Sequence, residues 1–274
     1  MRLRRLAAEL RRLRVAAGLS QDDVERQTHI NVATLYRIET AKAKPQVRTL
    51  KALLDLYGVT DVQRADLMTL QKEAGKRGWL QEQDAELPGQ YPTYISFEAE
   101  ARQICNYESL FVPGLLQTEA YARAVVRGVR PTASEEDVEI RVAARLQRQK
   151  LLADEHRPGF WAILDEGVLA RMVGGPDVMR EQIARLAEHA RDPFVTVQVV
   201  PFAAGAHPGM PGSFVVMKFG SDDPDIVYVD SMAGDLFLEQ EAELTRYNSI
   251  FEHLRAVALS PGDTTAMLKK LAAS

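Results

Sequence analysis

Cysteine is almost absent from this sequence of 274 residues, and long apolar runs are missing altogether. The single Cys105 excludes a disulfide framework and a zinc cluster built on cysteines. The five histidines, at positions 29, 156, 189, 207 and 253, are far apart and lack the spacing of metal ligands. Because neither a signal-peptide pattern nor an apolar run of membrane-spanning length is present, we expect a cytoplasmic protein without a metal or cofactor.

The net charge of -4 hides an asymmetry along the chain. Residues 1–60 hold 12 Lys and Arg against 6 Asp and Glu, whereas the remaining residues hold 22 against 32. A basic N-terminal region on an acidic body indicates that this region can lie on phosphates while the body is repelled from them. A basic helix face that is merely solvated is the alternative interpretation. The length allows about two domains, each with its own core.

The stretch from Gly18 to Pro45, GLSQDDVERQTHINVATLYRIETAKAKP, predicts two short helices joined by a tight turn. A preceding helix is predicted by leucines at positions 3, 6, 10 and 13, and Gly18 ends it. Ser20 is a good N-cap for the first short helix, and Asn31 is placed to cap the second. Two helices with this spacing, followed by lysines, indicate a helix-turn-helix that binds DNA.

The second short helix is predicted to turn Leu35 and Ile38 inward and to present its other side to the major groove. The residues expected to contact bases are Val32, Ala33, Tyr36 and Arg37. Arg37 can bond a guanine through two hydrogen bonds, and Val32 or Ala33 can touch a thymine methyl. Four residues at the ends of this helix are expected to contact phosphates and to position it: Asn31, Thr40, Lys42 and Lys44.

Residues 3–58 resemble the XRE-type helix-turn-helix domain of phage repressors and Cro, through LRRLRVAAGLSQDDV, INVATLYRIE and KPQVRTLKALLDLYGV. The resemblance implies that Gln21 contacts a DNA phosphate. It also implies a buried ion pair of Arg14 with Glu39, which ties the first helix to the recognition helix. Two positions depart from the family pattern: Glu25 stands where a small Ala is common, and His29 where the turn usually has Gly. Histidine tolerates positive φ, so the turn is expected to survive, whereas Glu25 has no evident role.

Two further helices complete the expected DNA-binding domain, residues 1–75. The fourth is predicted by Val47, Leu50, Leu53, Leu54 and Tyr57, and the fifth runs to about Gly75. Residues 76–92 show no hydrophobic period and carry turn residues, which predicts a linker. A second domain is expected over residues 93–274.

This second domain is predicted to be α+β, with helices around a small central sheet, so the whole chain is mainly α. Its first helix is expected from about Thr93 through ISFEAEARQICNYES, until Val112-Pro113-Gly114 breaks it. Leu115 and Leu116 beyond this break fit either a core or a docking surface. The other expected elements are helices at 118–128, 134–152, 176–191, 240–258 and 261–272, and strands at 160–164, 195–200, 214–219 and 226–229.

The second domain is similar to the antitoxin-like C-terminal domain of actinomycete XRE-type regulators, through ISFEAEARQI, LFVPGLLQTEAYARAVV, LDEGVL, GGPDVMREQIARL, VTVQVVPFAAGAHPGMPGSF and VYVDS. The resemblance implies a small toxin-like partner protein, encoded by a neighbouring gene, and repression of the protein's own operon. We therefore expect a sequence-specific DNA-binding regulator, an autorepressor that binds double-stranded operator DNA as a homodimer. Such a protein is associated with the nucleoid when bound to DNA.

Two other functions stay open from the residues alone. A one-component regulator would sense a small molecule in the second domain, beneath the loop with His207 and Pro208. The candidates for contact with a partner or ligand are Pro113, Leu115, Leu116, His207 and Pro208.

An enzyme is the second alternative, and it would need an acid-base site made from Asp165, Glu166, His207 and Asp230. Nothing in the spacing of these residues requires such a site. The loop GAHPGMPG also lacks the Gly-Lys-Ser/Thr ending of a phosphate loop and precedes a strand, not a helix. We therefore expect no enzyme activity.

Overall fold

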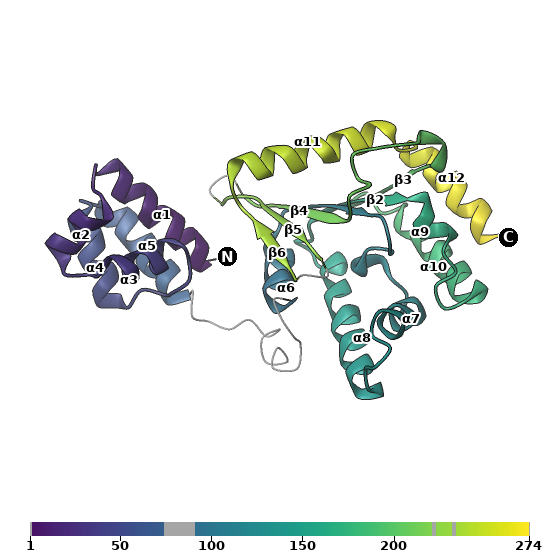
Figure 1. Cartoon of the computed structure of the whole chain (residues 1–274), viewed down its shortest axis with the longest axis horizontal. Coiled ribbons are helices and arrows are strands. Elements are labelled where there is room, and N and C mark those ends of the chain that lie inside the picture. The colour runs from purple at the N-terminus through teal and green to yellow at the C-terminus, as the bar shows by residue number, and fades with distance from the viewer. Residues whose placement is uncertain (1, 74–90, 221–222, 232–233, 274) are drawn as a thin grey trace. The chain divides into compact units, whose positions relative to one another are not determined.

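The computed structural model describes residues 2–73, 91–220, 223–231 and 234–273 (Figure 1). The chain divides into two compact units, Met1–Glu82 and Gln83–Ser274. Most of the expected linker, residues 76–92, lies outside the described residues. Its last two residues, Tyr91 and Pro92, instead begin a helix of the second unit, α6 (Tyr91–Glu100), two residues earlier than expected.

Five helices form the described part of the first unit: α1 (Arg2–Ala16), α2 (Gln21–Thr28), α3 (Val32–Glu39), α4 (Val47–Leu56) and α5 (Asp61–Glu73). The predicted apolar stripes meet in one core, whose buried members include Leu6, Leu10, Val24, Leu35, Ile38, Leu50, Leu53 and Leu54. Val47, expected on the buried stripe, is instead 46 % exposed at the first position of α4. The helical domain is confirmed.

Local capping explains where the first three helices begin and end. Gly18 adopts a φ of +69°, which a residue with a Cβ rarely adopts, and its N–H donates to Val15 O at 2.9 Å. Ser20 and Asp23 form a capping box at the start of α2. The Asn31 side chain accepts from the N–H of Ala33 at the start of α3. These sequence predictions are confirmed.

A six-stranded sheet lies at the centre of the second unit, in the order β3-β2-β1-β4-β5-β6. Its strands are β1 (Gln103–Glu108), β2 (Gly159–Asp165), β3 (Val195–Val200), β4 (Phe214–Lys218), β5 (Ile226–Val229) and β6 (Leu236–Leu238). The first three strands run parallel to one another, and β4 to β6 pair antiparallel. The α+β prediction is confirmed, with β6 as a strand that the sequence did not indicate.

The helices of this unit cover both faces of the sheet (Figure 1). They are α6, α7 (Glu119–Val129), α8 (Glu135–Gln149), α9 (Glu166–Ala170), α10 (Pro176–His189), α11 (Glu241–Val257) and α12 (Pro261–Ala272), with 3-10 turns at Gly114–Leu116, Lys150–Ala153 and Phe202–Ala204. Figure 1 shows α11 on one face and α6, α7 and α8 on the other. Phe251 and Leu254 of α11 pack with Tyr107, Ile163 and Phe214 of the sheet. Because β1, β2 and β3 run parallel, their carboxyl ends lie at the same end of the sheet.

The predicted first helix of the second domain is wrong beyond Glu100. The chain leaves the helix there, and residues 103–108 form β1, which pairs with β2 on one side and with β4 on the other. Four successive residues of β1, from Ile104 to Tyr107, are buried. A central strand buried on both faces lacks the alternation of apolar and polar residues that marks a half-buried strand, so hydrophobic periodicity alone does not distinguish it from a buried helix.

Candidate nucleic-acid interface

The turn between α2 and α3 holds its shape through His29. This residue has a φ of +58°, and its N–H donates to Glu25 O at 2.8 Å. The hydroxyl of Thr28 donates to Val24 O at 2.7 Å, and Ile30 packs partly buried against the core. His29 thus takes the left-handed conformation usually left to glycine, as predicted.

The α3 helix turns one side inward and one outward. Leu35 and Ile38 are buried, whereas Ala33, Thr34, Tyr36 and Arg37 are exposed. Val32 is partly buried. Of the predicted base-contacting residues, Ala33, Tyr36 and Arg37 therefore lie fully on the outward side, and Val32 lies at its margin.

Thr34 is an outward residue that the sequence interpretation missed. It precedes Arg37 by three positions, and residues at this spacing lie next to each other on a helix surface. The helical period that places Ala33 and Arg37 on the outward side also places Thr34 there, so the sequence could have predicted its position. Its hydroxyl adds a hydrogen-bonding group to the outward face.

Glu25, which departs from the family pattern, has a defined partner in the structure. Its Oε1 accepts from Asn31 Nδ2 at 3.0 Å, while Asn31 Oδ1 caps α3. The side chain of Asn31 is thereby fixed between α2 and α3, with one hydrogen of its amide left over. The phosphate contact of Asn31 stays a prediction that would use this remaining hydrogen.

The ion pair between Arg14 and Glu39 is confirmed. Arg14 Nε lies 2.7 Å from Glu39 Oε1, and Arg14 Nη2 lies 3.0 Å from Glu39 Oε2. The side chains are 12 % and 2 % exposed. Arg14 also donates to Leu19 O, and the hydrogen bond to Glu39 raises the pKa of its guanidinium. The pair joins α1 to the last residue of α3.

Gln21 belongs to the same network, because its Nε2 donates to Glu39 Oε2 at 2.9 Å. The second hydrogen of this amide is left for a phosphate oxygen, so the contact implied by the resemblance stays a prediction. An inward bond of this kind fixes the orientation of the side chain at the start of α2. A positioned amide loses little conformational entropy on binding.

The C-terminal end of α3 leads into an exposed basic segment. Ala41 has a φ of +55°, and the N–H groups of Lys42 and Ala43 both donate to Arg37 O. Lys42 and Lys44 are exposed, and Lys42 Nζ lies 5.4 Å from the centre of the Tyr36 ring. Thr40 uses its one hydroxyl hydrogen to bond Tyr36 O at 2.6 Å, and its phosphate contact stays a prediction.

The predicted docking residues after the Pro113 break are core residues in the second unit. Pro113, Leu115 and Leu116 are all buried. Gln117 Nε2 donates to Val112 O, and Gln182 Nε2 donates to Leu116 O, so hydrogen bonds close this turn against the interior. Of the two interpretations left open for Leu115 and Leu116, the core is the right one, and none of the three residues is available to a partner.

Two of the residues considered for acid-base chemistry do meet. His207 Nε2 lies 3.2 Å from Asp165 Oδ2, and the histidine side chain is 6 % exposed. Glu166 Oε2 accepts from the N–H of Phe202, and Asp230 follows a different strand, β5. Pro208 is exposed beside His207. The structure therefore assembles a histidine and a carboxylate, but not the full group of four.

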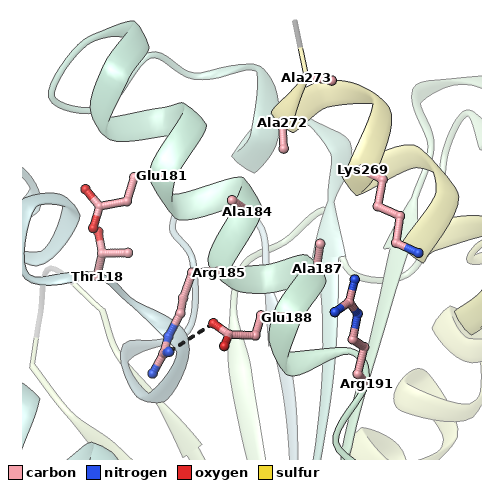
Figure 2. Close-up of a pocket in the computed structure, with 10 residues that line it drawn as sticks. All are labelled: Thr118, Glu181, Ala184, Arg185, Ala187, Glu188, Arg191, Lys269, Ala272 and Ala273. Carbon is pink, nitrogen blue, oxygen red and sulfur yellow. Dashed lines mark hydrogen bonds and ion pairs between the residues drawn. The ribbon is translucent and has the colours of Figure 1, made fainter.

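A shallow groove of about 720 Å³ lies between α10 and α12 (Figure 2). Alanines 184, 187, 272 and 273 line it, together with charged side chains such as Arg185, Glu188 and Lys269. Figure 2 shows Arg185 directed at Glu188, and the two groups are 3.2 Å apart. This pairing is typical of a solvated helix surface, so the groove points to no particular ligand.

The described residues hold no cluster of three or more His, Cys, Asp or Glu side chains suited to a metal ion. Among the same residues, no helix is long and apolar enough to cross a membrane.

Two family models match the chain. The model described as Helix-turn-helix domain matches residues 5–67, and the model described as Domain of unknown function (DUF5753) matches residues 91–270, more than half of the chain. No curated protein and no solved structure matches it. The first match fits the α2–α3 geometry and suggests a DNA-binding regulator.

Proposed function

The chain belongs to the family defined by the Domain of unknown function (DUF5753), and we propose that it is a transcriptional regulator that represses its own operon. Its helix-turn-helix domain reads the operator. The second domain binds a small protein encoded by a neighbouring gene, which controls the regulator. Neither domain acts as an enzyme in this proposal.

The observation that carries the DNA-reading role is the outward face of α3. Arg37 and Tyr36 are exposed on a helix whose inner side is fixed by Leu35, Ile38 and the Arg14–Glu39 pair. A side chain that reads a base must be presented by a rigid element, since a shift of an ångström breaks paired hydrogen bonds. Basic side chains beyond the helix supply the electrostatic contacts that position it.

A salt titration of the intact protein tests this role. We expect tight binding to the DNA upstream of its own gene, weaker binding to an unrelated duplex of equal length, and a steep loss of both affinities as salt rises. Fluorescence anisotropy with labelled duplexes measures all three quantities. Equal affinity for the two duplexes, or no salt dependence, would remove the support for sequence-specific repression.

The partner-binding role rests on the resemblance to antitoxin-like regulators and on the acidic character of the second domain. Residues 93–274 carry 18 Lys and Arg against 26 Asp and Glu, so a basic or neutral small protein is the complementary partner. Co-expression of the regulator with the product of the adjacent gene, followed by size-exclusion chromatography, tests this. Two proteins that elute separately at micromolar concentration would contradict it.

The absence of enzyme activity is also a proposal. The Asp165–His207 contact is the arrangement nearest to a catalytic group in the described part of the chain, and His207 is almost fully enclosed there. The dyad fits a role in holding the loop to the sheet. Turnover of any substrate that disappears in His207→Gln would contradict this interpretation.

A further inference from the structure

Glu25 carries a negative charge that forms an ion pair with no basic side chain of the described residues. Its neighbour Arg26 pairs with Asp23 instead, three residues earlier on the same helix. Glu25 Oε1 accepts a hydrogen bond from the amide of Asn31, at 3.0 Å. Because this amide is neutral, the carboxylate keeps its full charge, which acts on any charged group that approaches the turn between α2 and α3.

The hydrogen bond to Asn31 holds this charge at the N-terminal end of α3. Asn31 is the N-cap of α3, and its Oδ1 accepts from the N–H of Ala33 at 2.9 Å. Negative charge is favoured at the N-terminal end of a helix, so the free protein accommodates the carboxylate there. In a helix-turn-helix this end of the second helix enters the major groove of DNA. Glu25 therefore lies on the side of the motif that would meet DNA.

A phosphate bound by Asn31 would lie close to the carboxylate of Glu25. The amide of Asn31 has two hydrogens, and Glu25 accepts one of them. An oxygen that accepted the second hydrogen at an ordinary length would lie about 5 Å from Glu25 Oε1, since the two N–H bonds of an amide diverge by about 120°. Two negative charges at this separation repel each other even in water.

We propose that Glu25 limits the affinity of the helix-turn-helix for DNA by repelling the phosphate nearest to Asn31. The inference rests on the proposed DNA-binding function and adds to it a residue that opposes binding. Phosphates carry no sequence information, so the repulsion weakens binding to every duplex by a similar factor. Arg37 thus sets the base preference, whereas Glu25 sets the affinity that all sequences share.

A role of Glu25 in orienting Asn31 alone predicts a different result. In that case the hydrogen bond would matter and the charge would not, so Glu25→Ala would weaken DNA binding and Glu25→Gln would leave it unchanged. Glutamine separates the two roles, because its amide oxygen accepts the same hydrogen bond without carrying a charge.

Fluorescence anisotropy of the intact protein with labelled duplexes measures the effect of Glu25→Gln. We expect this variant to bind both the operator duplex and an unrelated duplex more tightly than the parent, by about fourfold or more at low salt. The gain should shrink as salt rises, because ions screen the repulsion. Binding equal to or weaker than that of the parent on both duplexes would overturn the proposal.

Asp66→Asn is the matched control. Asp66 is an exposed carboxylate on α5, outside the α2–α3 motif, and its replacement changes the net charge of the protein by the same amount. We expect this control to change both affinities by less than about twofold, because the proposed repulsion depends on the position of Glu25 beside Asn31. A gain equal to that of Glu25→Gln would show that net charge alone acts, and would overturn the proposal.

The proposed repressor function is tested by a different ratio of the same affinities. Repression requires that the parent prefers the operator to unrelated DNA, whereas the role of Glu25 requires that the variant binds each duplex more tightly than the parent does. Equal affinities of the parent for the two duplexes would contradict repression and leave the role of Glu25 standing. A missing gain in Glu25→Gln would overturn the role of Glu25 and leave the repressor proposal standing.

Discussion

The carboxylate of Glu39 accepts hydrogen bonds from two side chains of the helix-turn-helix, Arg14 and Gln21. Both its oxygens are used, and the side chain is 2 % exposed. A buried ion pair of this kind adds little net stability over an apolar pair, but it fixes geometry, and the loss of one partner leaves the other charge buried. At this residue, α1, α2 and α3 are joined.

Replacing Glu39 with Gln should therefore lower the free energy of unfolding by about 3 kcal/mol, because Arg14 then stays charged and buried without its counter-ion. Arg12→Gln is the control, since Arg12 pairs with Glu9 on the surface and its loss should change stability by less than about 1 kcal/mol. Urea denaturation of both variants measures the difference. Equal effects would show that the buried pair has no special role.

Single residues differ in how much of their role the sequence reveals. Gly18, Ser20, Asn31 and His29 act through their own backbone or through a residue close by, so local rules predicted them. Glu25 acts through Asn31 across the turn, and that contact exists only once both helices are in place. The helical period of the sequence was sufficient to predict that Thr34 is exposed, but this residue was missed.

At the scale of elements, β1 shows where periodicity fails. Its residues are buried on both faces because the strand lies between two others and under helices. These neighbours are distant in the sequence, so the residues around β1 do not reveal them. Strands β2 to β5 were predicted, since short runs of β-branched, aromatic and other apolar residues bounded by turn residues indicate strands directly.

The end of β1 also makes stability depend on pH. Burial raises the pKa of Glu108 to about 7, so the folded state holds a proton that the unfolded chain releases at lower pH. The group favours folding most below its unfolded pKa, and this contribution is lost as pH rises towards the folded value. Between pH 4.5 and pH 7 the loss should reach up to about 3 kcal/mol for this one group.

Denaturant titrations at a series of pH values measure this slope. Glu108→Gln cannot ionise, so its stability should fall less steeply than that of the parent over this range. Glu119→Gln, an exposed carboxyl on α7, should keep the parental slope. An unchanged slope in Glu108→Gln would mean that the carboxyl titrates near its ordinary pKa.

At the scale of the whole molecule, two units of opposite character share one chain. The first 60 residues carry an excess of basic side chains and the rest an excess of acidic ones. The change in composition and period predicts that the DNA-binding domain ends near residue 75, and the chain divides into two compact units after Glu82. The hydrophobic period of a sequence predicts helices and strands, but it does not predict which partner the surface of the second unit binds.

A dimer of the regulator should read two half-sites in a palindromic operator, because a two-fold axis in the protein imposes one on the DNA. Hydroxyl-radical footprinting should show two protected patches about one or two helical turns apart. Analytical ultracentrifugation of the intact protein should give the mass of a dimer. A single protected patch together with a monomer mass would contradict this arrangement.

The central claim is that the outward face of α3 reads bases while the lysines beyond it only position the helix. The affinities of Arg37→Ala and Lys42→Ala for operator and for unrelated DNA test it most directly. We expect Arg37→Ala to lose about 1 to 3 kcal/mol on the operator and almost nothing on unrelated DNA. We expect Lys42→Ala to weaken both alike and to reduce the salt dependence. An equal loss on both duplexes for Arg37→Ala would contradict the claim.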